Sequence, residues 1–256
     1  MGGSVNHLLV VGGYSRLAKS TLDHFASLGF VISSIDIQSP KEVRPKVKDF
    51  TADISSLDTC VPVLRRVIEE SGPVSSVVFF SRHRFRGGAA EDRADWQGSV
   101  DVELRAPSVI LHELIGLSEN KSELRSSVLI GSVLGRLVSL NQTASYHTTK
   151  TATEGLVRYL ATKFLADGVR VNAIAPGFIS DKRPQLSEKD QKITTALPSA
   201  VISLVPVVTS QNLASACFFL CSENSMGING QTIVVDGGWS NIEQLGLLLD
   251  YKGQDK

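Results

Sequence analysis

The sequence of 256 residues predicts one α/β domain built on a mostly parallel β-sheet. Three observations predict it: apolar strand-like runs alternate with segments of helical period, a glycine turn separates the first run from the first helix, and no linker divides the chain. A single domain of this size is common among α/β folds. The strand-like runs lie at 8–11, 30–35, 74–80, 127–130, 169–174 and 232–235, and the helical segments include 57–70, 95–117 and 145–166.

The first strand-like run leads directly into the glycine turn. Residues 8–11 are apolar, Gly12-Gly13 follows, and a helix-like stretch covers 15–27. Such a turn places the amides of the helix start where a pyrophosphate group can bind. The second run ends in Asp36, at about the interval of 20 residues where an acidic side chain binds the ribose 2′-hydroxyl of a dinucleotide. Because a carboxylate repels a 2′-phosphate, Asp36 favours NAD over NADP.

The second half of the chain carries a hydroxyl, a phenol and an amine at informative positions. The run 127–130 ends in Gly131-Ser132, on the carboxyl edge where open α/β sheets bind ligands. In the helical segment 145–166, Tyr146 and Lys150 are four residues apart and therefore share one face. A lysine charge near the phenol lowers the pKa of Tyr146 from about 10 toward neutrality, which suits general acid/base catalysis.

Taken in order, these motifs resemble the short-chain dehydrogenase/reductase family, over about Leu8 to Ser240. They are the glycine turn, Asp36, Asp53-Ile54, Ser132, Tyr146 with Lys150, and the runs RVNAIAPG at 170–177 and GINGQTIVVDGG at 227–238. The resemblance implies a single doubly wound Rossmann domain over 1–256, with a mostly parallel seven-stranded sheet flanked by helices. It also implies a substrate lid at 179–208, and 241–256 is a C-terminal extension beyond the family pattern.

The resemblance also implies roles for individual residues. Tyr146 would donate or accept the proton, Ser132 would orient the substrate oxygen, and Lys150 would bind the nicotinamide ribose and depress the tyrosine pKa. Glu103 aligns with the asparagine of the family's proton relay; it either serves that relay differently, forms an ion pair with Lys150, or contacts another subunit. The cofactor is expected to be NAD, with NADP less favoured, and to contact Gly12, Ser15, Arg16, Leu17, Asp36, Asp53, Ile54, Ser81, Tyr146, Lys150, Pro176, Gly177 and Ile179.

The glycine turn departs from the family's three-glycine pattern. Arg16 stands for the second glycine and Ala18 for the third. Alanine is a small change, whereas arginine adds a long cation where the backbone would approach the pyrophosphate. Arg16 is therefore expected to bind the phosphates, to block the dinucleotide, or to point into solvent.

A second departure follows the fourth strand. There Phe79-Phe80-Ser81-Arg82 replaces the family's Asn-Asn-Ala-Gly, and His83, Arg84 and Arg86 come next. Guanidinium groups pair bidentately with carboxylate or phosphate, so this cluster of three arginines and a histidine could clamp an anionic substrate. The alternative is a solvated loop.

Composition limits the possible partners. The 26 basic and 26 acidic residues cancel, which leaves no electrostatic footprint for nucleic acid or an anionic membrane. The three cysteines lack metal-ligand spacing, so no metal site is expected. The first residues do not resemble a signal peptide and no apolar run could span a bilayer, which predicts a cytoplasmic protein. A small-molecule substrate is expected, and the resemblance implies a homodimer or homotetramer.

The predicted function is that of an NAD(P)(H)-dependent oxidoreductase that interconverts a hydroxyl and a carbonyl on a small organic substrate, with Tyr146 as general acid/base. Two alternatives stay open because fold does not determine function. The first is a non-redox, cofactor-independent lyase, isomerase or cyclase that uses the same phenol. The second is a catalytically silent binding subunit. The altered glycine turn and the lost Asn-Asn-Ala-Gly segment would be the features that indicate it.

Overall fold

Seven parallel strands form one sheet in the order β3-β2-β1-β4-β5-β6-β7, which confirms the predicted fold class. The computed structural model describes residues 6–40, 42–83, 93–118, 123–181 and 208–243. The sequence runs located every strand except β3, in which only Phe50 is buried. The strands are β1 (His7–Val11), β2 (Val31–Asp36), β3 (Lys48–Thr51), β4 (Ser76–Phe79), β5 (Ser126–Ile130), β6 (Arg170–Pro176) and β7 (Thr232–Val235).

The strand order reverses beside β1. The chain runs from β1 to β2 and β3 on one side, and then crosses to β4 and onward to β7 on the other. In open α/β sheets the crevice outside the carboxyl ends of the strands at such a reversal is where ligands bind. The topology therefore places the glycine turn after β1 and the segment after β4 at the edge of one crevice.

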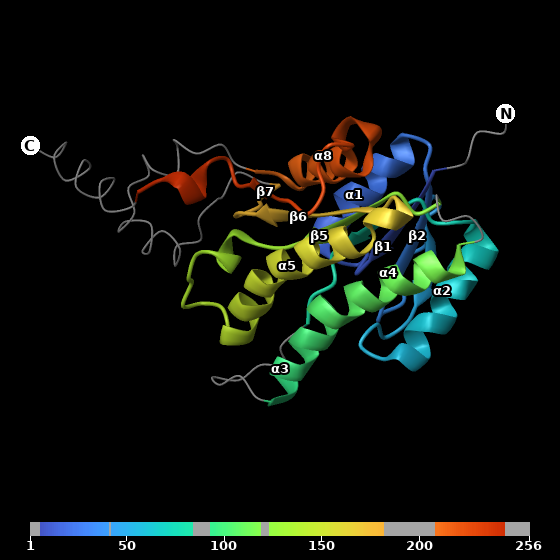
Figure 1. The fold of residues 1–256 in the computed structure, drawn as a ribbon, viewed down its shortest axis with the longest axis horizontal. Helices are drawn as coiled ribbons and strands as arrows, with labels where there is room; N and C mark the ends of the chain where they lie inside the picture. Colours follow the sequence, from blue (N-terminus) through green and yellow to red (C-terminus); the bar gives the residue numbers. More distant parts are fainter. Residues whose placement is uncertain (1–5, 41, 84–92, 119–122, 182–207, 244–256) are drawn as a thin grey trace, which may run out of the picture.

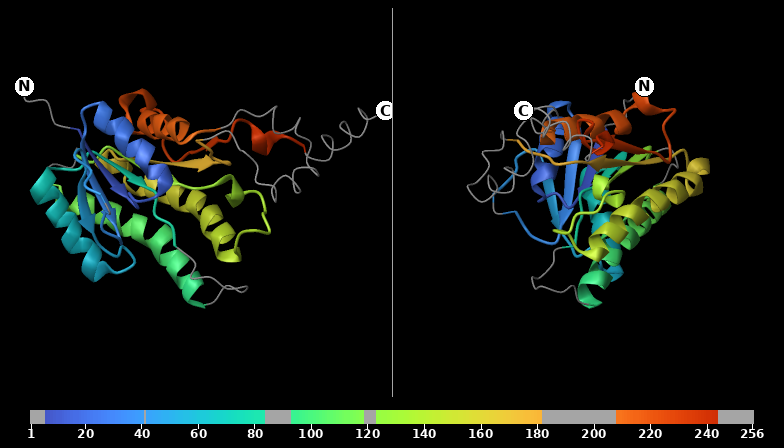
Figure 2. Two further views of the ribbon diagram at one scale, coloured as in Figure 1. Left: turned by 180° about the vertical axis from the view of Figure 1, so that it is seen from behind. Right: turned by 90° about the vertical axis from the view of Figure 1, so that its left-hand side faces the viewer.

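Helices cover both faces of the sheet (Figures 1 and 2). The helices α1 and α8 pack together on one face, and α2, α4 and α5 lie on the other. The α-helices are α1 (Arg16–Ser27), α2 (Leu57–Ser71), α3 (Arg93–Val100), α4 (Ala106–Leu117), α5 (Ala144–Lys163) and α8 (Ser210–Cys221). A π-helical turn spans Asp101–Arg105, and 3-10 turns span Val133–Gly135, Leu165–Asp167, Glu223–Ser225 and Trp239–Asn241.

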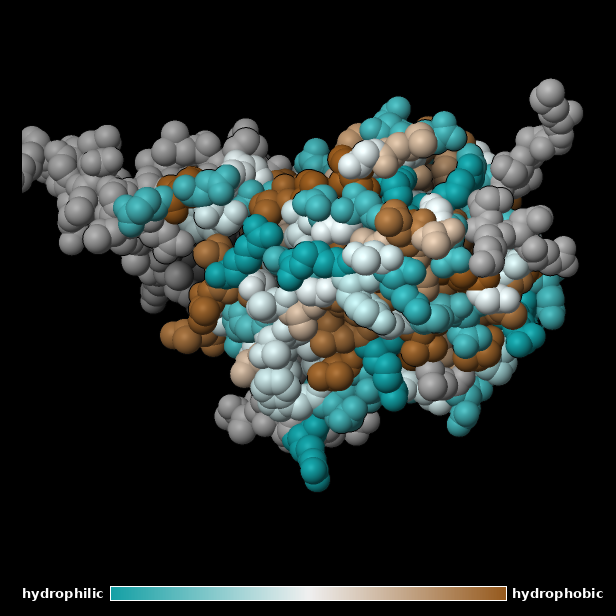
Figure 3. All heavy atoms as spheres, viewed as in Figure 1, coloured by the Kyte–Doolittle hydropathy of each residue, from teal (hydrophilic) through white to brown (hydrophobic). Residues whose placement is uncertain are grey.

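The sheet separates two apolar cores. Along β1, Leu8 and Val10 belong to the core shared with α1 and α8, whereas Leu9 and Val11 belong to the core shared with α2, α4 and α5. A strand buried on both faces is continuously apolar, which is why this run was recognisable in the sequence. On the face shown in Figure 3, hydrophilic and hydrophobic residues are intermingled over the described part of the surface.

The structure divides one expected helix and describes only a small part of two other expected segments. The helix expected over 95–117 is interrupted, because the π-helical turn at Asp101–Arg105 separates α3 from α4. Of the expected lid, residues 182–207 lie outside the described residues, as do residues 244–256 of the expected C-terminal extension. None of the described helices is both long and apolar enough to cross a membrane.

A buried histidine at the start of β1 makes stability depend on pH. His7 is 1% exposed, with Nδ1 2.9 Å from the Gly72 carbonyl oxygen and Nε2 2.9 Å from Ser33 Oγ. Burial lowers the pKa of His7 below its ordinary value of 6.5. The unfolded chain then binds a proton at a higher pH than the folded chain does, so the free energy of unfolding falls as pH drops below about 6.5.

We expect urea unfolding to report this loss between about pH 7 and pH 5.5, and His7→Asn to make the free energy of unfolding less dependent on pH across that window. Asparagine keeps hydrogen-bonding groups at this position but does not titrate. An equal fall in the variant and the wild type would contradict the assignment to His7.

Candidate active site

A cavity of about 910 Å³ opens at the carboxyl edge of the sheet. Residues that follow β1, β2, β3, β4, β5 and β6 line it, as the strand order requires. The cavity is large enough for a cofactor-sized ligand. It brings together most of the predicted site residues, namely Gly12, Ser15, Leu17, Asp36, Asp53, Ile54, Ser81, Ser132, Tyr146, Lys150, Pro176 and Gly177.

The glycine turn forms part of the cavity wall. Gly12 has a φ of +83°, and a Cβ on it would lie 2.6 Å from the backbone nitrogen of Ser81. Only glycine fits this close approach between the ends of β1 and β4. Ser15 caps α1 by accepting a hydrogen bond from the Leu17 backbone N–H at 3.3 Å. The N-terminus of α1 therefore lies at the cavity, where backbone N–H groups and the helix dipole favour an anion.

The Arg16 side chain contacts the segment after β6 and does not line the cavity. Its Nη2 donates to the Ile179 carbonyl oxygen at 3.2 Å, and its Nη1 lies 3.7 Å from the Asp181 carboxylate. Asp181 in turn accepts hydrogen bonds from the backbone and side chain of Ser210, each at 2.7 Å, at the start of α8. Arg16 and Ile179 are thus the two predicted cofactor residues outside the cavity lining. The Arg16 side chain is 68% exposed, so of the three positions expected for it the structure agrees best with the solvent-exposed one, with added contacts to Ile179 and Asp181.

The Asp36 carboxylate is held in place at the end of β2. It accepts hydrogen bonds from the backbone N–H groups of Tyr14 at 3.0 Å and Gln38 at 3.2 Å. The nearby cation Arg44 forms an ion pair with Asp49 and donates to the Gly13 carbonyl oxygen at 3.0 Å. Arg44 is therefore already neutralised, and the charge that Asp36 presents to the cavity is negative.

Arg44 also stacks on the aromatic ring of Tyr14. The guanidinium carbon lies 4.5 Å from the ring centroid. Burial is the main reason that the pKa of Tyr14 rises to about 12, so this phenol stays protonated at neutral pH. Tyr14 is thus a packing partner of Arg44 and no acid/base group.

The phenol, the amine and the hydroxyl predicted from the sequence line the same cavity. Thr143 caps α5 by accepting a hydrogen bond from the Tyr146 backbone N–H at 3.2 Å, which puts Tyr146 in the first turn of the helix. One turn later, Lys150 Nζ lies 5.7 Å from the centroid of the Tyr146 ring and donates to the Ile130 carbonyl oxygen at 3.1 Å. Ser132 is buried just after β5 and accepts from the Leu134 N–H at 3.1 Å.

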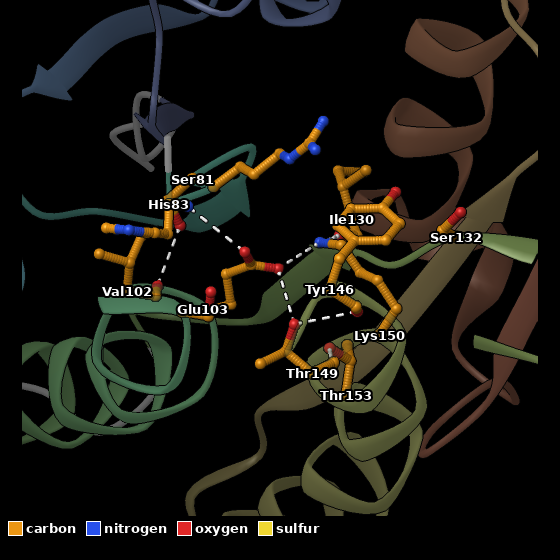
Figure 4. Close-up of polar contacts among 12 residues, drawn as sticks. Ser81, His83, Val102, Glu103, Ile130, Ser132, Tyr146, Thr149, Lys150 and Thr153 are labelled. Atoms are coloured by element: carbon orange, nitrogen blue, oxygen red, sulfur yellow. Dashed lines mark hydrogen bonds and ion pairs between the residues drawn. The ribbon is translucent and has the colours of Figure 1, made fainter. Parts of the chain in front are cut away.

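Glu103 forms a buried ion pair with Lys150 (Figure 4). The carboxylate lies 2.9 Å from Lys150 Nζ, and the two side chains are only 2% and 7% exposed. It also accepts from the backbone N–H of His83 and from Thr149 Oγ1, both at 3.3 Å. Of the three roles considered for Glu103, the structure supports the ion pair with Lys150.

The π-helical turn explains how Glu103 reaches this position. Such turns insert an extra residue into a helix and often occur at functional sites. The turn lies between α3 and α4, in the stretch that the sequence predicted as one helix. Helical periodicity did not reveal it, because α4 is apolar at most of its positions and so shows no narrow stripe that would mark a change of face.

The segment after β4 also contributes to the cavity. Arg82 and His83 line it, and the guanidinium carbon of Arg82 lies 4.6 Å from the centroid of the Tyr146 ring. The His83 ring lies 3.2 Å from Asp95 and packs on Gly98, where a Cβ would be only 2.3 Å from it. The sequence did not single out several other lining residues, which are mostly at strand ends: Ile35, Ile37, Ala52, Val102 and Ile130.

Comparison with known proteins gives the family of the chain. A family model described as enoyl-(acyl carrier protein) reductase matches residues 13–240. The chain belongs to the short-chain dehydrogenase/reductase family. A 2-dehydro-3-deoxy-D-gluconate 5-dehydrogenase of Dickeya dadantii is 26% identical over 243 residues, which cover 90% of this chain and 94% of that relative.

Solved structures of this short-chain dehydrogenase/reductase fold match nearly the whole chain. A short-chain dehydrogenase of Leptospira borgpetersenii with bound NAD+ has a TM-score of 0.77 at 19% identity, covering 92% of this chain and 93% of that one. The protein ElxO with NADP bound has a TM-score of 0.76 at 19% identity, covering 93% of this chain and 100% of that one. At this identity the likeness establishes the fold.

Proposed function

We propose that the protein is an NAD-dependent oxidoreductase that interconverts a hydroxyl and a carbonyl on a small organic substrate. The observation that carries the proposal is that Ser132, Tyr146 and Lys150 line one cavity with the glycine turn and Asp36. A phenol next to an ammonium group is suited to proton transfer, and the other end of the cavity is suited to a dinucleotide.

The residues present fit a nicotinamide dinucleotide. The N-terminus of α1, capped at Ser15, would hold the pyrophosphate, and the carboxylate of Asp36 would accept hydrogen bonds from the adenosine ribose. Gly12 keeps the backbone free of a side chain between the ends of β1 and β4. When bound, the nicotinamide supplies hydride transfer to or from the substrate carbon.

The protein's own residues would handle the proton. In the oxidation direction the substrate hydroxyl loses its proton to Tyr146 as its carbon loses hydride, and a carbonyl forms; reduction reverses both transfers. Ser132 would hydrogen-bond the substrate oxygen and so fix its orientation. Lys150, anchored by Glu103 and the Ile130 carbonyl oxygen, would keep a positive charge near the phenol.

The preference for NAD rests on Asp36. Its carboxylate would repel a 2′-phosphate, and Arg44, the nearby cation, is paired with Asp49. The structural neighbours hold either NAD+ or NADP, so the family alone does not select one cofactor. A homodimer or homotetramer and a cytoplasmic location stay predictions, and light scattering of the purified protein tests the first.

We expect saturable NADH binding, measured by nicotinamide fluorescence, and weaker binding of NADPH. Asp36→Asn should narrow the NADH/NADPH affinity ratio by at least about tenfold, because like-charge juxtaposition costs several kcal/mol. The control is Asp58→Asn, which removes a carboxylate from the exposed first turn of α2 outside the cavity. Absence of saturable NADH binding would refute the proposal and favour the cofactor-independent enzyme or the silent binding subunit.

Arg16→Gly tests the unusual glycine turn. Because the Arg16 side chain is bound to the segment after β6, we expect the NADH affinity of the variant to change by less than about fivefold, the range of an exposed ion pair. The measurement is the same fluorescence titration. A large gain in affinity would mean that Arg16 blocks the cofactor, and a large loss would mean that it binds the phosphates.

A further inference from the structure

Most charged side chains that line the cavity already have partners. Lys150 is paired with Glu103, and His83 lies 3.2 Å from Asp95. Asp36 and Asp53, on the side of β2 and β3, accept hydrogen bonds from backbone N–H groups at 3.2 Å or less. Lys150 thus has an acidic partner within the protein, and Asp36 and Asp53 add negative charge to the β2 and β3 side of the cavity.

Arg82 is different. Among the residues that the structure describes, no carboxylate forms an ion pair with it. Its guanidinium carbon lies 4.6 Å from the Tyr146 ring centroid, and its Nη2 donates to the Gln142 side-chain oxygen at 3.1 Å. Stacking on the ring and this one hydrogen bond orient the guanidinium, and no other described residue takes its remaining N–H groups.

The position of Arg82 links its charge to the proposed chemistry. It follows β4 and stacks on the phenol that would transfer the proton. The bond to Gln142 joins this segment to the loop before α5, across 60 residues of sequence. A ligand held by the guanidinium would therefore have its anionic group close to Tyr146, within the same cavity.

We propose that Arg82 binds a carboxylate of the substrate, so that the substrate is a hydroxy or oxo acid. The inference rests on the proposed function for the oxidation or reduction of the substrate, whereas binding of the carboxylate by Arg82 does not depend on it. Guanidinium presents parallel N–H groups that match one planar carboxylate. Lys150 is paired with Glu103, so Arg82 is the cation without an acidic partner among the described residues that line the cavity, and one guanidinium suits a monoanionic carboxylate better than a dianionic phosphate.

Binding of matched small ketones to the intact protein, measured by calorimetry without cofactor and with NAD+, which cannot reduce a ketone, tests the proposal. The probes are 2-oxobutyrate, acetoacetate and 4-oxopentanoate, each compared with its neutral amide, and dihydroxyacetone phosphate as the phosphate probe. We expect at least one oxo acid to bind more tightly than its amide. Arg82→Met should lower the affinity for that acid by about 10- to 100-fold, the range for hydrogen bonds to charged groups. It should leave the affinity for the amide unchanged.

Two further variants separate binding from packing. Arg82→Lys keeps the charge but loses the bidentate geometry, so its affinity for the acid should lie between those of wild type and Arg82→Met. Arg66→Met is the matched control, because Arg66 also lies over an aromatic ring, 5.5 Å from the centroid of Phe50, but outside the cavity. This control should bind the oxo acids like the wild type.

Three results would overturn the inference: no oxo acid binds better than its amide, Arg82→Met weakens acid and amide equally, or the phosphate probe binds more tightly than every oxo acid. The NADH titration is separate. Normal NADH binding without preference for the acids would refute the role of Arg82 alone, whereas preference for the acids without NADH binding would refute the proposed redox function alone.

Discussion

Replacing Tyr146 with phenylalanine is expected to lower kcat by about 10²- to 10⁴-fold, the contribution typical of a positioned general acid/base. The substitution removes one oxygen and keeps the ring that lies near Arg82 and Lys150, so the fold and the affinity for NADH should be nearly unchanged. The measurement is NADH formation or consumption with a panel of hydroxy acids, oxo acids and aldoses.

Tyr159→Phe is the matched control for this prediction. Tyr159 lies on the same helix, is 62% exposed and does not line the cavity, so its variant should keep the wild-type kcat. An unchanged kcat in Tyr146→Phe would show that the phenol does not transfer the proton. An activity that needs no cofactor and is lost in Tyr146→Phe would instead support the lyase, isomerase or cyclase alternative.

Replacing Glu103 with alanine is expected to lower the free energy of unfolding by about 3–5 kcal/mol, the cost of leaving one charge of a buried ion pair without its partner. Lys150 is 7% exposed, so water cannot readily replace the carboxylate. The backbone N–H of His83 and the hydroxyl of Thr149 lose an acceptor in the same variant. Urea unfolding of the wild type and the variant measures the difference.

A second substitution distinguishes the ion pair from a general packing defect. Adding Lys150→Met to Glu103→Ala removes the unpaired charge and should recover part of the lost stability. The exposed pair of Lys19 and Asp23 serves as a control, because Asp23→Ala should cost no more than about 1 kcal/mol. No recovery in the double variant would mean that the loss comes from packing.

The strands and the chemistry at their carboxyl ends were predictable because both are recorded in local patterns. A central parallel strand is buried on both faces, so runs such as 8–11 and 128–130 are continuously apolar. Once the strands are parallel, their carboxyl ends meet at one edge. Gly12, Asp36 and Ser132 follow three of those strands, and the structure brings them to one cavity.

Contacts between distant segments were not predictable in the same way. The Arg16 side chain had three possible positions, and the choice depends on Ile179, which is 163 residues away in the sequence. The π-helical turn that directs Glu103 toward Lys150 leaves no clear signal in helical periodicity. The cluster of arginines after β4 was visible as composition, but the position of Arg82 over the Tyr146 ring was not.

The sequence by itself determined the α/β class, the order of the motifs and the residue types that can transfer a proton or hold a dinucleotide, since apolar periodicity and motif spacing are local properties. Only the tertiary structure decided which charges are neutralised. Glu103 is paired with Lys150, Arg44 with Asp49, and Arg16 is held away from the cavity. The physical reason is that ion pairing and burial depend on distances between side chains whose residues are far apart in the chain.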